Sequence, residues 1–359
     1  MEMKRNVILV AMAVVMLSRC NSPQKNSEDE KVQEKDPLEV VANLTIRPGN
    51  VAVSSNNRVF TTVHPFGNPA SAMELIEITG ETTYEAFPNE NYQNISEEAS
   101  DDRLDTPLGI RINNKKLWII DIGLKLGKTR LFTFDIESRE EVFRFDFPEE
   151  VAPKGSFLQD LAVDDKNGWV YLADIANPGI IVLNTENGEA RRFYDDSMNP
   201  ENVDMIIDEK VVYFGGAPAR VAVNPITLSE DRNTLYYGAM SGTTWYQLPA
   251  ELFRNGASDD TIREAIRVKG PKPVSDGAAT DNIGNTYFTN IQHHGIDVLT
   301  DAGDLSPIVR DTRIDWPDNV SVSDSGYLYF TVNQLHKSPE FTGGEDEGKG
   351  PFYIYRMRL

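Results

Sequence analysis

One phrase of about sixteen residues occurs twice near the C-terminus and constrains the fold more than any other feature. Its copies are residues 275–290 and 317–333, and in each an Asp (Asp276 or Asp318) is followed eight residues later by Gly and eleven later by Tyr. Alternating apolar residues on both sides of a Gly turn predict a β-hairpin. Recurrence after about forty residues is typical of a repeat architecture.

Earlier copies extend the pattern back to Val40. Residues 158–174 repeat the spacing from Asp160 to Gly168 and Tyr171. Altered copies occupy residues 48–60, 107–121 and 219–237, the last with additional residues, 226–233, in its turn. Each of the six copies is accompanied by a further strand pair, so the sequence predicts an all-β fold, a six-bladed β-propeller with four-stranded blades around a central channel.

The two ends of the chain are predicted to meet in the last blade. The strand at residues 40–46 would complete the blade that contains residues 352–359, which removes an open sheet edge. Helical periodicity is scarce, and residues 249–254 and 259–266 are expected to be surface insertions between blades 4 and 5.

The N-terminus has the pattern of an export signal. Lys4 and Arg5 precede an apolar run, Val7–Leu17, which is too short to span a bilayer stably. Cys20 ends a segment that resembles a bacterial lipobox, although Arg19 replaces the usual small residue, so lipidation of Cys20 and a plain signal peptide both stay open. We therefore expect a signal peptide at 1–19, a disordered tether at 20–38, a propeller at 39–359, and a secreted or extracytoplasmic protein, either free or lipid-anchored to a bacterial membrane.

The charge balance restricts the partners. With 35 basic and 56 acidic residues the net charge is −21, which repels phosphate backbones, so we expect no nucleic-acid partner. The negative electrostatic field of such a surface favours a cationic ligand. Cys20 is the only cysteine, so the ring has no disulfide. Oligomerisation is not addressed by any sequence feature.

A propeller offers a natural site at the mouth of its channel, where the innermost strands of all blades converge. The polar residues that precede these strands should point toward the axis, and others that follow the return strands should lie near the same mouth. The first group is Asn50, Asp160, Arg220, Asp276, Asp318 and Asn319, with Leu108 or Gly109 in the second blade, and the second group is Asp121, Asp174, Asn290 and Asn333.

Three of these carboxylates suggest a metal site. Asp276, Asp160 and Asp318 could together coordinate a hard divalent cation such as Ca²⁺, which takes oxygen ligands. The alternative is that each Asp caps a turn by accepting bonds from backbone amides.

Histidines supply the remaining candidates for catalysis. His293 and His294 are adjacent, so a shared zinc site is weak, but one of them could act as a general base. His64 and His336 also follow inner-blade phrases. The sequence contains no Gly-x-Ser-x-Gly elbow, P-loop or dinucleotide fingerprint, which argues against serine hydrolases, kinases and dehydrogenases.

Several phrases, taken together, resemble the major royal jelly protein and Yellow family from about Leu44 to Leu359. The closest runs in this sequence are residues 311–318 and 326–336, supported by residues 158–164, 233–237, 246–249, 275–277 and 284–289. The resemblance implies a six-bladed propeller. It also implies diverse activities, which include binding of aromatic biogenic amines, dopachrome conversion, and nutritional or signalling roles.

A more distant similarity is to gluconolactonase and regucalcin propellers, whose metal is held by a Glu of the first blade, an Asn and an Asp. Asp276 matches the Asp of that pattern, but Asn50 stands where the Glu is expected. The missing anionic ligand counts against a lactonase-type metal site here.

Four functions follow. The first is an exported protein that binds a small cationic or aromatic molecule in its channel. The second is a metal-dependent lactone hydrolase with Asp276 as metal ligand and general base. The third is a dopachrome-type isomerase that pairs His293 or His294 with Asp276, and the fourth is an interaction scaffold whose channel is unused.

Overall fold

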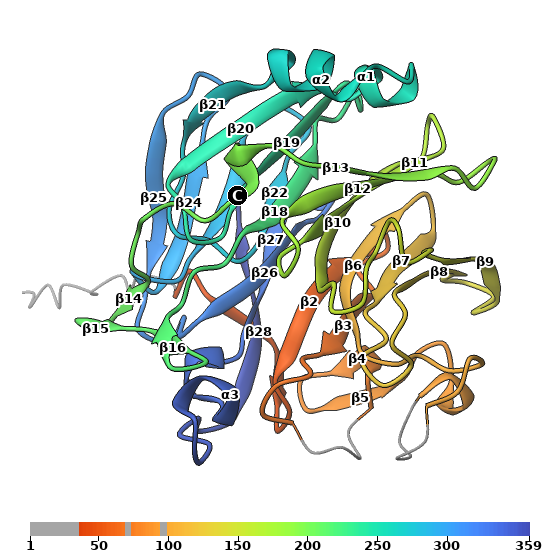
Figure 1. The fold of residues 1–359 in the computed structure, drawn as a ribbon. Coiled ribbons are helices and arrows are strands. Elements are labelled where there is room, and N and C mark those ends of the chain that lie inside the picture. Colours follow the sequence, from red (N-terminus) through yellow and green to blue (C-terminus); the bar gives the residue numbers. More distant parts are fainter. Residues whose placement is uncertain (1–35, 69–72, 94–98) are drawn as a thin grey trace, which may run out of the picture. The chain divides into compact units, whose positions relative to one another are not determined.

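Six four-stranded antiparallel sheets surround a central channel, and each contains one copy of the repeated phrase (Figure 1). The computed structural model describes residues 36–68, 73–93 and 99–359. Residues 37–359 form one structural unit, and its architecture confirms the predicted six-bladed β-propeller. The signal peptide at 1–19, Cys20 and most of the tether at 20–38 lie outside the described residues.

The first three blades follow one another along the chain. Blade 1 contains β2 (Pro48–Val53), β3 (Val59–Val63), β4 (Leu75–Gly80) and β5 (Thr83–Ala86); blade 2 contains β6 (Pro107–Asn113), β7 (Lys116–Asp121), β8 (Arg130–Asp135) and β9 (Glu141–Asp146); blade 3 contains β10 (Leu158–Asp164), β11 (Trp169–Asp174), β12 (Gly179–Asn184) and β13 (Ala190–Phe193).

The last three blades complete the ring. Blade 4 contains β18 (Val223–Leu228), β19 (Thr234–Ala239), β20 (Thr244–Pro249) and β21 (Arg267–Pro271); blade 5 contains β22 (Ala278–Thr280), β23 (Thr286–Asn290), β24 (Gly295–Leu299) and β25 (Leu305–Arg310); blade 6 contains β26 (Pro317–Val322), β27 (Tyr327–Val332), β28 (Phe352–Arg358) and β1 (Glu39–Leu44). The pairing of β1 with β28 confirms the predicted closure of the ring. The N-terminal strand β1 is the outer strand of the last blade and completes its set of four strands.

The hydrophobic core is divided among the blade interfaces. In the described residues one apolar cluster lies between each pair of neighbouring blades, including one that joins blade 6 to blade 1 through Ala42, Val51, Tyr329 and Ile354. The inner strands β2 and β10 are buried along their whole length because neighbouring blades cover both faces. This packing fixes the positions of the inner strands around the channel.

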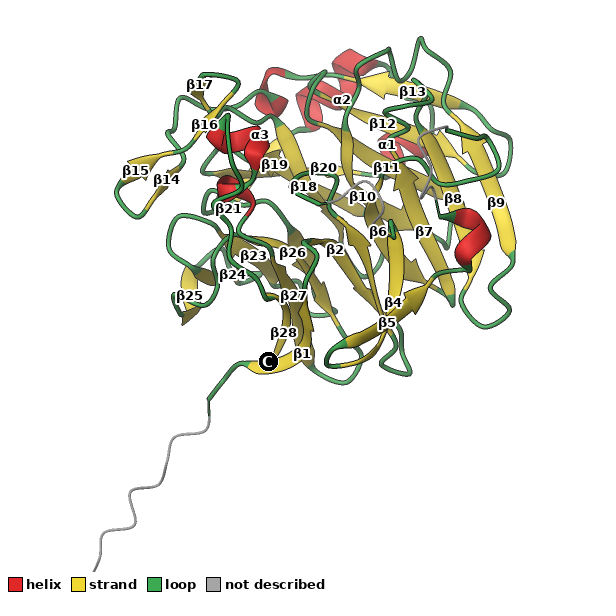
Figure 2. Ribbon diagram, turned by 90° about the horizontal axis from the view of Figure 1, so that it is seen from below, coloured by secondary structure: helices red, strands yellow, loops and turns green. Residues whose placement is uncertain are grey.

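Short helices and two additional hairpins connect strands of the ring (Figure 2). The helices are α1 (Glu251–Arg254), α2 (Asp259–Ala265) and α3 (Pro339–Thr342), with 3₁₀ turns η1 (Glu90–Tyr92), η2 (Asp196–Met198) and η3 (Leu335–Lys337). α1 and α2 join β20 to β21, so the expected insertion lies within blade 4 and not between blades 4 and 5. No helix in the described part of the chain is long and apolar enough to cross a membrane.

A mouth insertion, residues 199–222, connects blade 3 to blade 4. It contains the two-stranded hairpins β14 (Ile206–Ile207) with β15 (Lys210–Val211), and β16 (Tyr213–Phe214) with β17 (Ala217–Pro218). The second hairpin turns through Gly215 and Gly216, both with positive φ, which glycine adopts without a Cβ clash. A seventh apolar cluster, which includes Met205, Val274 and Trp316, packs this insertion against the channel mouth.

Candidate functional site at the channel mouth

The inner strands carry bulges where they begin, at the mouth end of the channel. In β2, β6, β10, β18 and β26 the register against the second strand of the blade shifts within the first residues, and β22 pairs with β23 only from Ala278 onward. Because a bulge sets two residues against one partner, consecutive side chains can both face the channel. Alignment of the six pairings defines a mouth tier of Gly49, Leu108, Gln159, Asn224, Asp276 and Asp318, and a middle tier of Asn50, Gly109, Asp160, Pro225, Gly277 and Asn319.

The ring is too narrow at the middle tier for a side chain in every blade. A Cβ atom added to Gly277 would lie 2.7 Å from the Cα atom of Asn319, and one added to Gly109 would lie 2.5 Å from the carbonyl oxygen of Gln159. Both obstacles are backbone atoms, which cannot move aside cheaply. Glycine at these positions therefore lets adjacent blades approach closely.

Arg111 fills the channel beneath the middle tier. The equivalent positions of the other five blades carry small side chains, which leaves space for its guanidinium group: Ala52, Ala162, Thr227, Ala279 and Ser321. The guanidinium donates to the carbonyl oxygens of Leu161, Val320 and Ala278 at 3.0–3.2 Å, and to both oxygens of Asp160 at 3.0 and 3.1 Å. Arg111 thus ties blade 2 to blades 3, 5 and 6.

Two cavities lie on opposite sides of the Arg111 side chain. The mouth cavity has a volume of about 380 Å³ and reaches down to Gln159 and Asp276 of the mouth tier. A second, polar cavity of about 230 Å³ is lined by Arg111 and the small residues around it. The two cavities share no lining residue, so the mouth cavity ends blindly in the channel.

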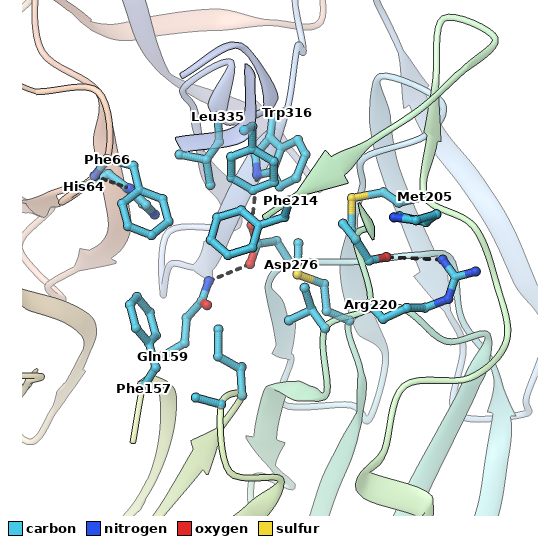
Figure 3. Close-up of a pocket in the computed structure, with 17 residues that line it drawn as sticks. His64, Phe66, Phe157, Gln159, Met205, Phe214, Arg220, Asp276, Trp316 and Leu335 are labelled. Carbon is cyan, nitrogen blue, oxygen red and sulfur yellow. Dashed lines mark hydrogen bonds between the residues drawn. The ribbon is translucent and has the colours of Figure 1, made fainter. Parts of the chain in front are cut away.

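Asp276 forms the floor of the mouth cavity, and its carboxylate accepts hydrogen bonds from three N–H donors, of which Figure 3 shows Gln159 and Trp316. Its Oδ1 accepts hydrogen bonds from Gln159 Nε2 at 2.8 Å and Asn224 Nδ2 at 2.6 Å, and its Oδ2 accepts one from Trp316 Nε1 at 2.9 Å. Burial, and then the neighbouring Asp318, raise the pKa of Asp276 well above its usual range, whereas the N–H donors oppose this shift. Of the site residues predicted from the sequence, Asp276 and Arg220 line the mouth cavity, with Asp276 at its floor.

Aromatic side chains form the walls and roof of the mouth cavity. Phe66 lies in the loop between β3 and β4 of blade 1, Phe157 precedes blade 3, Phe214 lies on the β16–β17 hairpin and Phe341 on α3. Phe66 stacks on Phe214 with ring centroids 6.2 Å apart, and Phe214 contacts Phe341 at 5.1 Å. We call Phe66, Phe214 and Phe341 the aromatic roof. It closes over the cavity, although Phe214 is itself 47% exposed.

His64 and Arg220 are the remaining titratable residues of the cavity wall. His64 is buried and its Nδ1 accepts a hydrogen bond from the backbone N–H of Phe66 at 3.1 Å. Burial, with a smaller contribution from Arg47, lowers the pKa of His64 to about 3, so its ring is neutral at pH 7. Arg220 is on the mouth insertion and pairs with Asp204. The predicted inner-strand position of Arg220 is therefore wrong, because residues 226–228 continue β18 and Asn224 occupies the mouth tier.

Five other predicted ligand-binding residues lie near the channel but do not line the mouth cavity: Asn50, Asp160, Asp318, Asn319 and Asn333. Asn333 Nδ2 donates to Asp318 Oδ2 at 2.7 Å and to the carbonyl oxygen of Pro48 at 3.0 Å. The side-chain oxygen of Asn319 accepts from the backbone of blade 1, and Asn50 lies in the same middle tier. These residues connect the blades around the floor of the cavity. Asp160 is likewise held by Arg111.

The structure separates the adjacent histidines from Asp276. His293 and His294 line a shallow depression with Asp208 and Arg310, and this depression shares no residue with the mouth cavity. His294 Nε2 lies 3.0 Å from Asp208 of the mouth insertion. Asn290 donates to Asp297 at 2.7 Å and accepts from the backbone of His293, as a turn residue does. The structure does not bring either histidine together with Asp276.

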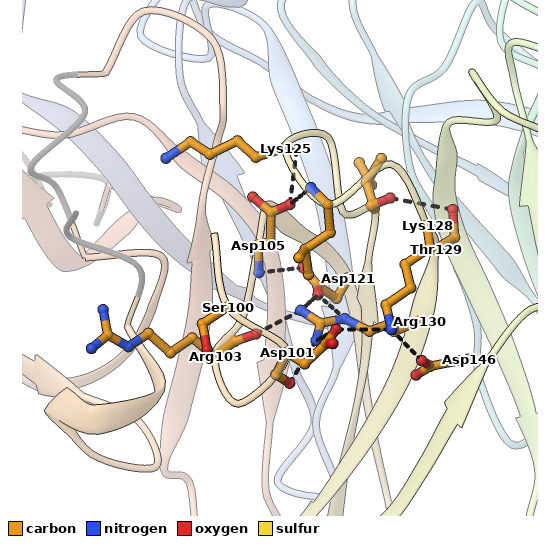
Figure 4. A network of polar contacts seen from close by, with 12 residues as sticks. Ser100, Asp101, Arg103, Asp105, Asp121, Lys125, Lys128, Thr129, Arg130 and Asp146 are labelled. Atoms are coloured by element: carbon orange, nitrogen blue, oxygen red, sulfur yellow. Dashed lines mark hydrogen bonds and ion pairs between the residues drawn. The ribbon is translucent and has the colours of Figure 1, made fainter. Parts of the chain in front are cut away.

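The acidic residues that follow the return strands hold loops in place. Asp121 forms a fully buried ion pair with Arg130 at 2.5 Å and accepts the backbone N–H of Asp105 at 2.7 Å (Figure 4). Burial outweighs Arg130 and raises the pKa of Asp121 to about 7. Asp174 repeats this arrangement with Arg192 at 2.6 Å. Both carboxylates are engaged within their own blades and neither lines the mouth cavity.

The side chains around Asp276, Asp160 and Asp318 do not fit a divalent metal ion. Among the described residues, no three His, Cys, Asp or Glu side chains lie close enough together to hold a metal ion. Asp276 faces three N–H donors, and Asp160 is occupied by Arg111. The metal site expected at Asp276, Asp160 and Asp318 has no support in this geometry.

Gln159, Asn224, Trp316 and the aromatic roof were not singled out by the sequence patterns. Gln159 precedes a candidate Asp by one residue, and Trp316 belongs to the closing phrase, so both could have been found from the repeat. The roof residues lie in loops of different length outside the repeat. Only packing around the mouth reveals them.

Comparisons with known proteins agree with this architecture. Residues 108–342 match the family model described as major royal jelly protein. A Yellow-related salivary protein, M35 of Phlebotomus duboscqi, is 22% identical over 253 residues, which cover 61% of this chain and 62% of that relative. The matched segment thus spans less than two thirds of that relative's length.

Solved structures with similar folds include enzymes and a binding protein. A gluconolactonase from Xanthomonas campestris superposes with a TM-score of 0.54 at 12% identity, covering 90% of this chain and 89% of its own. Regucalcin from Agrobacterium tumefaciens, a calcium-binding protein, gives 0.56 at 14% identity over 89% and 94%. Virginiamycin B lyase from Staphylococcus aureus gives 0.53 at 14% identity over 90% and 99%. At these identities the likeness concerns the fold alone.

Proposed function

This chain belongs to the major royal jelly protein family, and we propose that it binds a small aromatic molecule with a cationic amine in the mouth cavity. The observation that carries the proposal is Asp276, a buried carboxylate at the floor of a cavity with mainly apolar walls. Its Oδ2 accepts one hydrogen bond, from Trp316, and a carboxylate oxygen has a second acceptor position. An ammonium group would occupy that position.

The walls of the mouth cavity favour a ligand with an aromatic ring. Phe66, Phe157, Phe214 and Trp316 present ring faces and edges, which stack on aromatic ligands and attract cations. A volume of about 380 Å³ is at the lower end of the range for small-molecule sites, roughly 300–1,000 Å³. A ligand with one or two rings fits this space.

The two catalytic alternatives have less support. A metal-dependent lactone hydrolase of the gluconolactonase type needs a Glu of the first blade where this chain has Asn50, and among the described residues no three His, Cys, Asp or Glu side chains lie close enough together to hold a metal ion. A dopachrome-type isomerase built on His293 or His294 needs one of them beside Asp276, and both line a different depression. His64 is the histidine of the mouth cavity, but burial lowers its pKa to about 3, which makes its ring a very weak base, and its Nδ1 already accepts from the backbone N–H of Phe66.

Export remains part of the proposal on sequence grounds. The apolar run at residues 7–17 and Cys20 support delivery to an extracytoplasmic space, with or without a lipid anchor. Fractionation of cells that express the full chain, compared with a Cys20→Ser variant, tests the anchor. Loss of membrane association in the variant is the expected result for a lipoprotein.

Calorimetry with matched probes tests the binding function. We expect 2-phenylethylamine to bind and 2-phenylethanol, its neutral analogue, to bind more weakly. Asp276→Asn should lower the amine affinity roughly 10- to 100-fold, since a hydrogen bond to a charged group contributes about 1.5–3 kcal/mol. Asp324→Asn, an exposed change in the β26–β27 turn, is the control. Equal affinity for both probes, or an Asp276→Asn variant that binds the amine normally, would contradict the proposal.

A further inference from the structure

The channel contains more buried carboxylates than cations. Asp160, Asp276 and Asp318 are each at most 2% exposed and occupy two consecutive tiers. Among the described side chains that face this part of the channel, Arg111 supplies a cation, and it pairs with Asp160 at 3.0 Å. Asp276 and Asp318 are left without a cationic partner in the described structure.

The hydrogen bonds distinguish these two carboxylates. Asp276 accepts three bonds from N–H donors, an arrangement that stabilises the ionised form. Asp318 Oδ2 accepts one bond, from Asn333, and its buried Oδ1 has no partner among the described residues. A proton shared by the pair therefore belongs mainly on Asp318, since an unpartnered oxygen is least costly when the carboxyl group is neutral.

We propose that the empty site keeps one proton on the Asp276–Asp318 pair and that a cationic ligand enters in exchange for it. This inference rests on the proposed function. Charge is conserved in the exchange: with Arg111, Asp160 and Asp276 ionised and Asp318 protonated, the empty site carries one negative charge. After an ammonium ion binds at Asp276 and the proton leaves to solvent, the three carboxylates, Arg111 and the ligand again sum to one negative charge.

The electrostatics of the pair support one retained proton, and the hydrogen bonds described above place it on Asp318. Burial, together with the nearby Asp160, raises the pKa of Asp318 to about 7. Burial and Asp318 raise the pKa of Asp276 well above its usual range. Two buried carboxylates in one site repel each other, so the second ionisation needs a compensating positive charge. A bound ammonium group would supply that charge.

The other charged groups around the cavity do not supply the exchanged proton. His64 is neutral at pH 7 because burial lowers its pKa to about 3. Arg220 is paired with Asp204, and Arg111 is paired with Asp160. Gln159, Asn224 and Trp316, which surround Asp276, do not titrate. A proton released near neutral pH would thus come from the carboxylate pair.

The exchange is measured by titrating 2-phenylethylamine into the protein at pH 7 in two buffers of different ionisation enthalpy. The dependence of the binding heat on the buffer gives the number of protons released per amine bound. We expect roughly half a proton to one proton for the wild type, from a group that titrates near pH 7. Asp318→Asn should bind the amine with almost no proton release, and Asp324→Asn should behave as the wild type. Amine binding without proton release by the wild type would overturn the inference.

A ligand-free measurement separates this inference from the proposed function. In protein labelled with ¹³C-aspartate, NMR titration should find a carboxyl group that titrates near neutrality and is absent from Asp318→Asn. If no such group exists although the amine binds, the exchange is wrong and the binding function stands. If the group titrates but the amine gives no binding heat, the binding function and the exchange both fail.

Discussion

Trp316 donates its indole N–H to Asp276 Oδ2 at 2.9 Å from a backbone in the left-handed region, with φ of 58°. Such a conformation is costly for a bulky residue and is typical of functional sites. The indole ring is fully buried, stacks on His336 at 5.7 Å and meets the edge of Phe341 at 5.4 Å. The surrounding packing therefore holds Trp316 where it can orient the carboxylate of Asp276.

Loss of this bond should weaken amine binding. Trp316→Phe keeps an aromatic wall but removes the N–H donor, so ionised Asp276 is less stable and amine affinity at pH 7 should fall about tenfold. The pH at which binding is half-maximal should also move upward, which a purely structural role would not cause. Trp118→Phe is a matched control, because Trp118 Nε1 has no partner among the described residues. Equal effects of the two substitutions would contradict a positioning role for Trp316.

The aromatic roof should control how quickly a ligand exchanges. Phe214→Ala removes the ring that packs against both Phe66 and Phe341, so we expect a several-fold faster dissociation of the amine in stopped-flow measurements. Stability should change little because Phe214 is 47% exposed. Tyr213→Ala, at a neighbouring residue that is 50% exposed, is the control. Unchanged dissociation in Phe214→Ala would show that ligands enter by another route.

Arg111 should be needed for stability. Arg111→Met leaves Asp160 buried without its cation, and removal of one partner of such a pair costs about 3–5 kcal/mol of unfolding free energy. Adding Asp160→Asn should recover part of this loss, since no unpaired charge then remains. Urea denaturation of the single and double variants measures both effects. A single variant as stable as the wild type would mean that solvent replaces Arg111 at no cost.

Asp318 should make the protein less stable as the pH rises. Its folded-state pKa of about 7 lies above the value of about 4 expected in the unfolded chain. The folded state then binds the proton more tightly, so the free energy of unfolding falls from about pH 4 to about pH 7 and levels off above. Asp318→Asn should remove the part of this fall that comes from Asp318, on the order of 4 kcal/mol, while the raised pKa of Asp121 leaves a residual fall in the variant. Denaturation series at pH 5 and pH 8 test it, and identical pH profiles would refute it.

The repeat spacing located the blades but misaligned part of the site. Asp160 and Asp276 both precede a Tyr by eleven residues, so the sequence treats them as equivalent. In the structure the hairpin turn runs from Asp164 to Trp169 in blade 3 and from Thr280 to Thr286 in blade 5, one residue longer. Gln159, not Asp160, therefore shares the mouth tier with Asp276. A shift of one position changes which tier a side chain joins.

The sequence by itself determined the number of blades and the closure by the N-terminal strand, because strand alternation and turn glycines are local properties that repeat along the chain, and it singled out Asp276 as a candidate. The tertiary structure alone decided that Arg111 closes the channel, that Gln159, Asn224 and Trp316 hold Asp276, and that His293 and His294 lie elsewhere. Those relationships join residues from different blades. Their distances depend on how the blades pack around the axis, which no local pattern encodes.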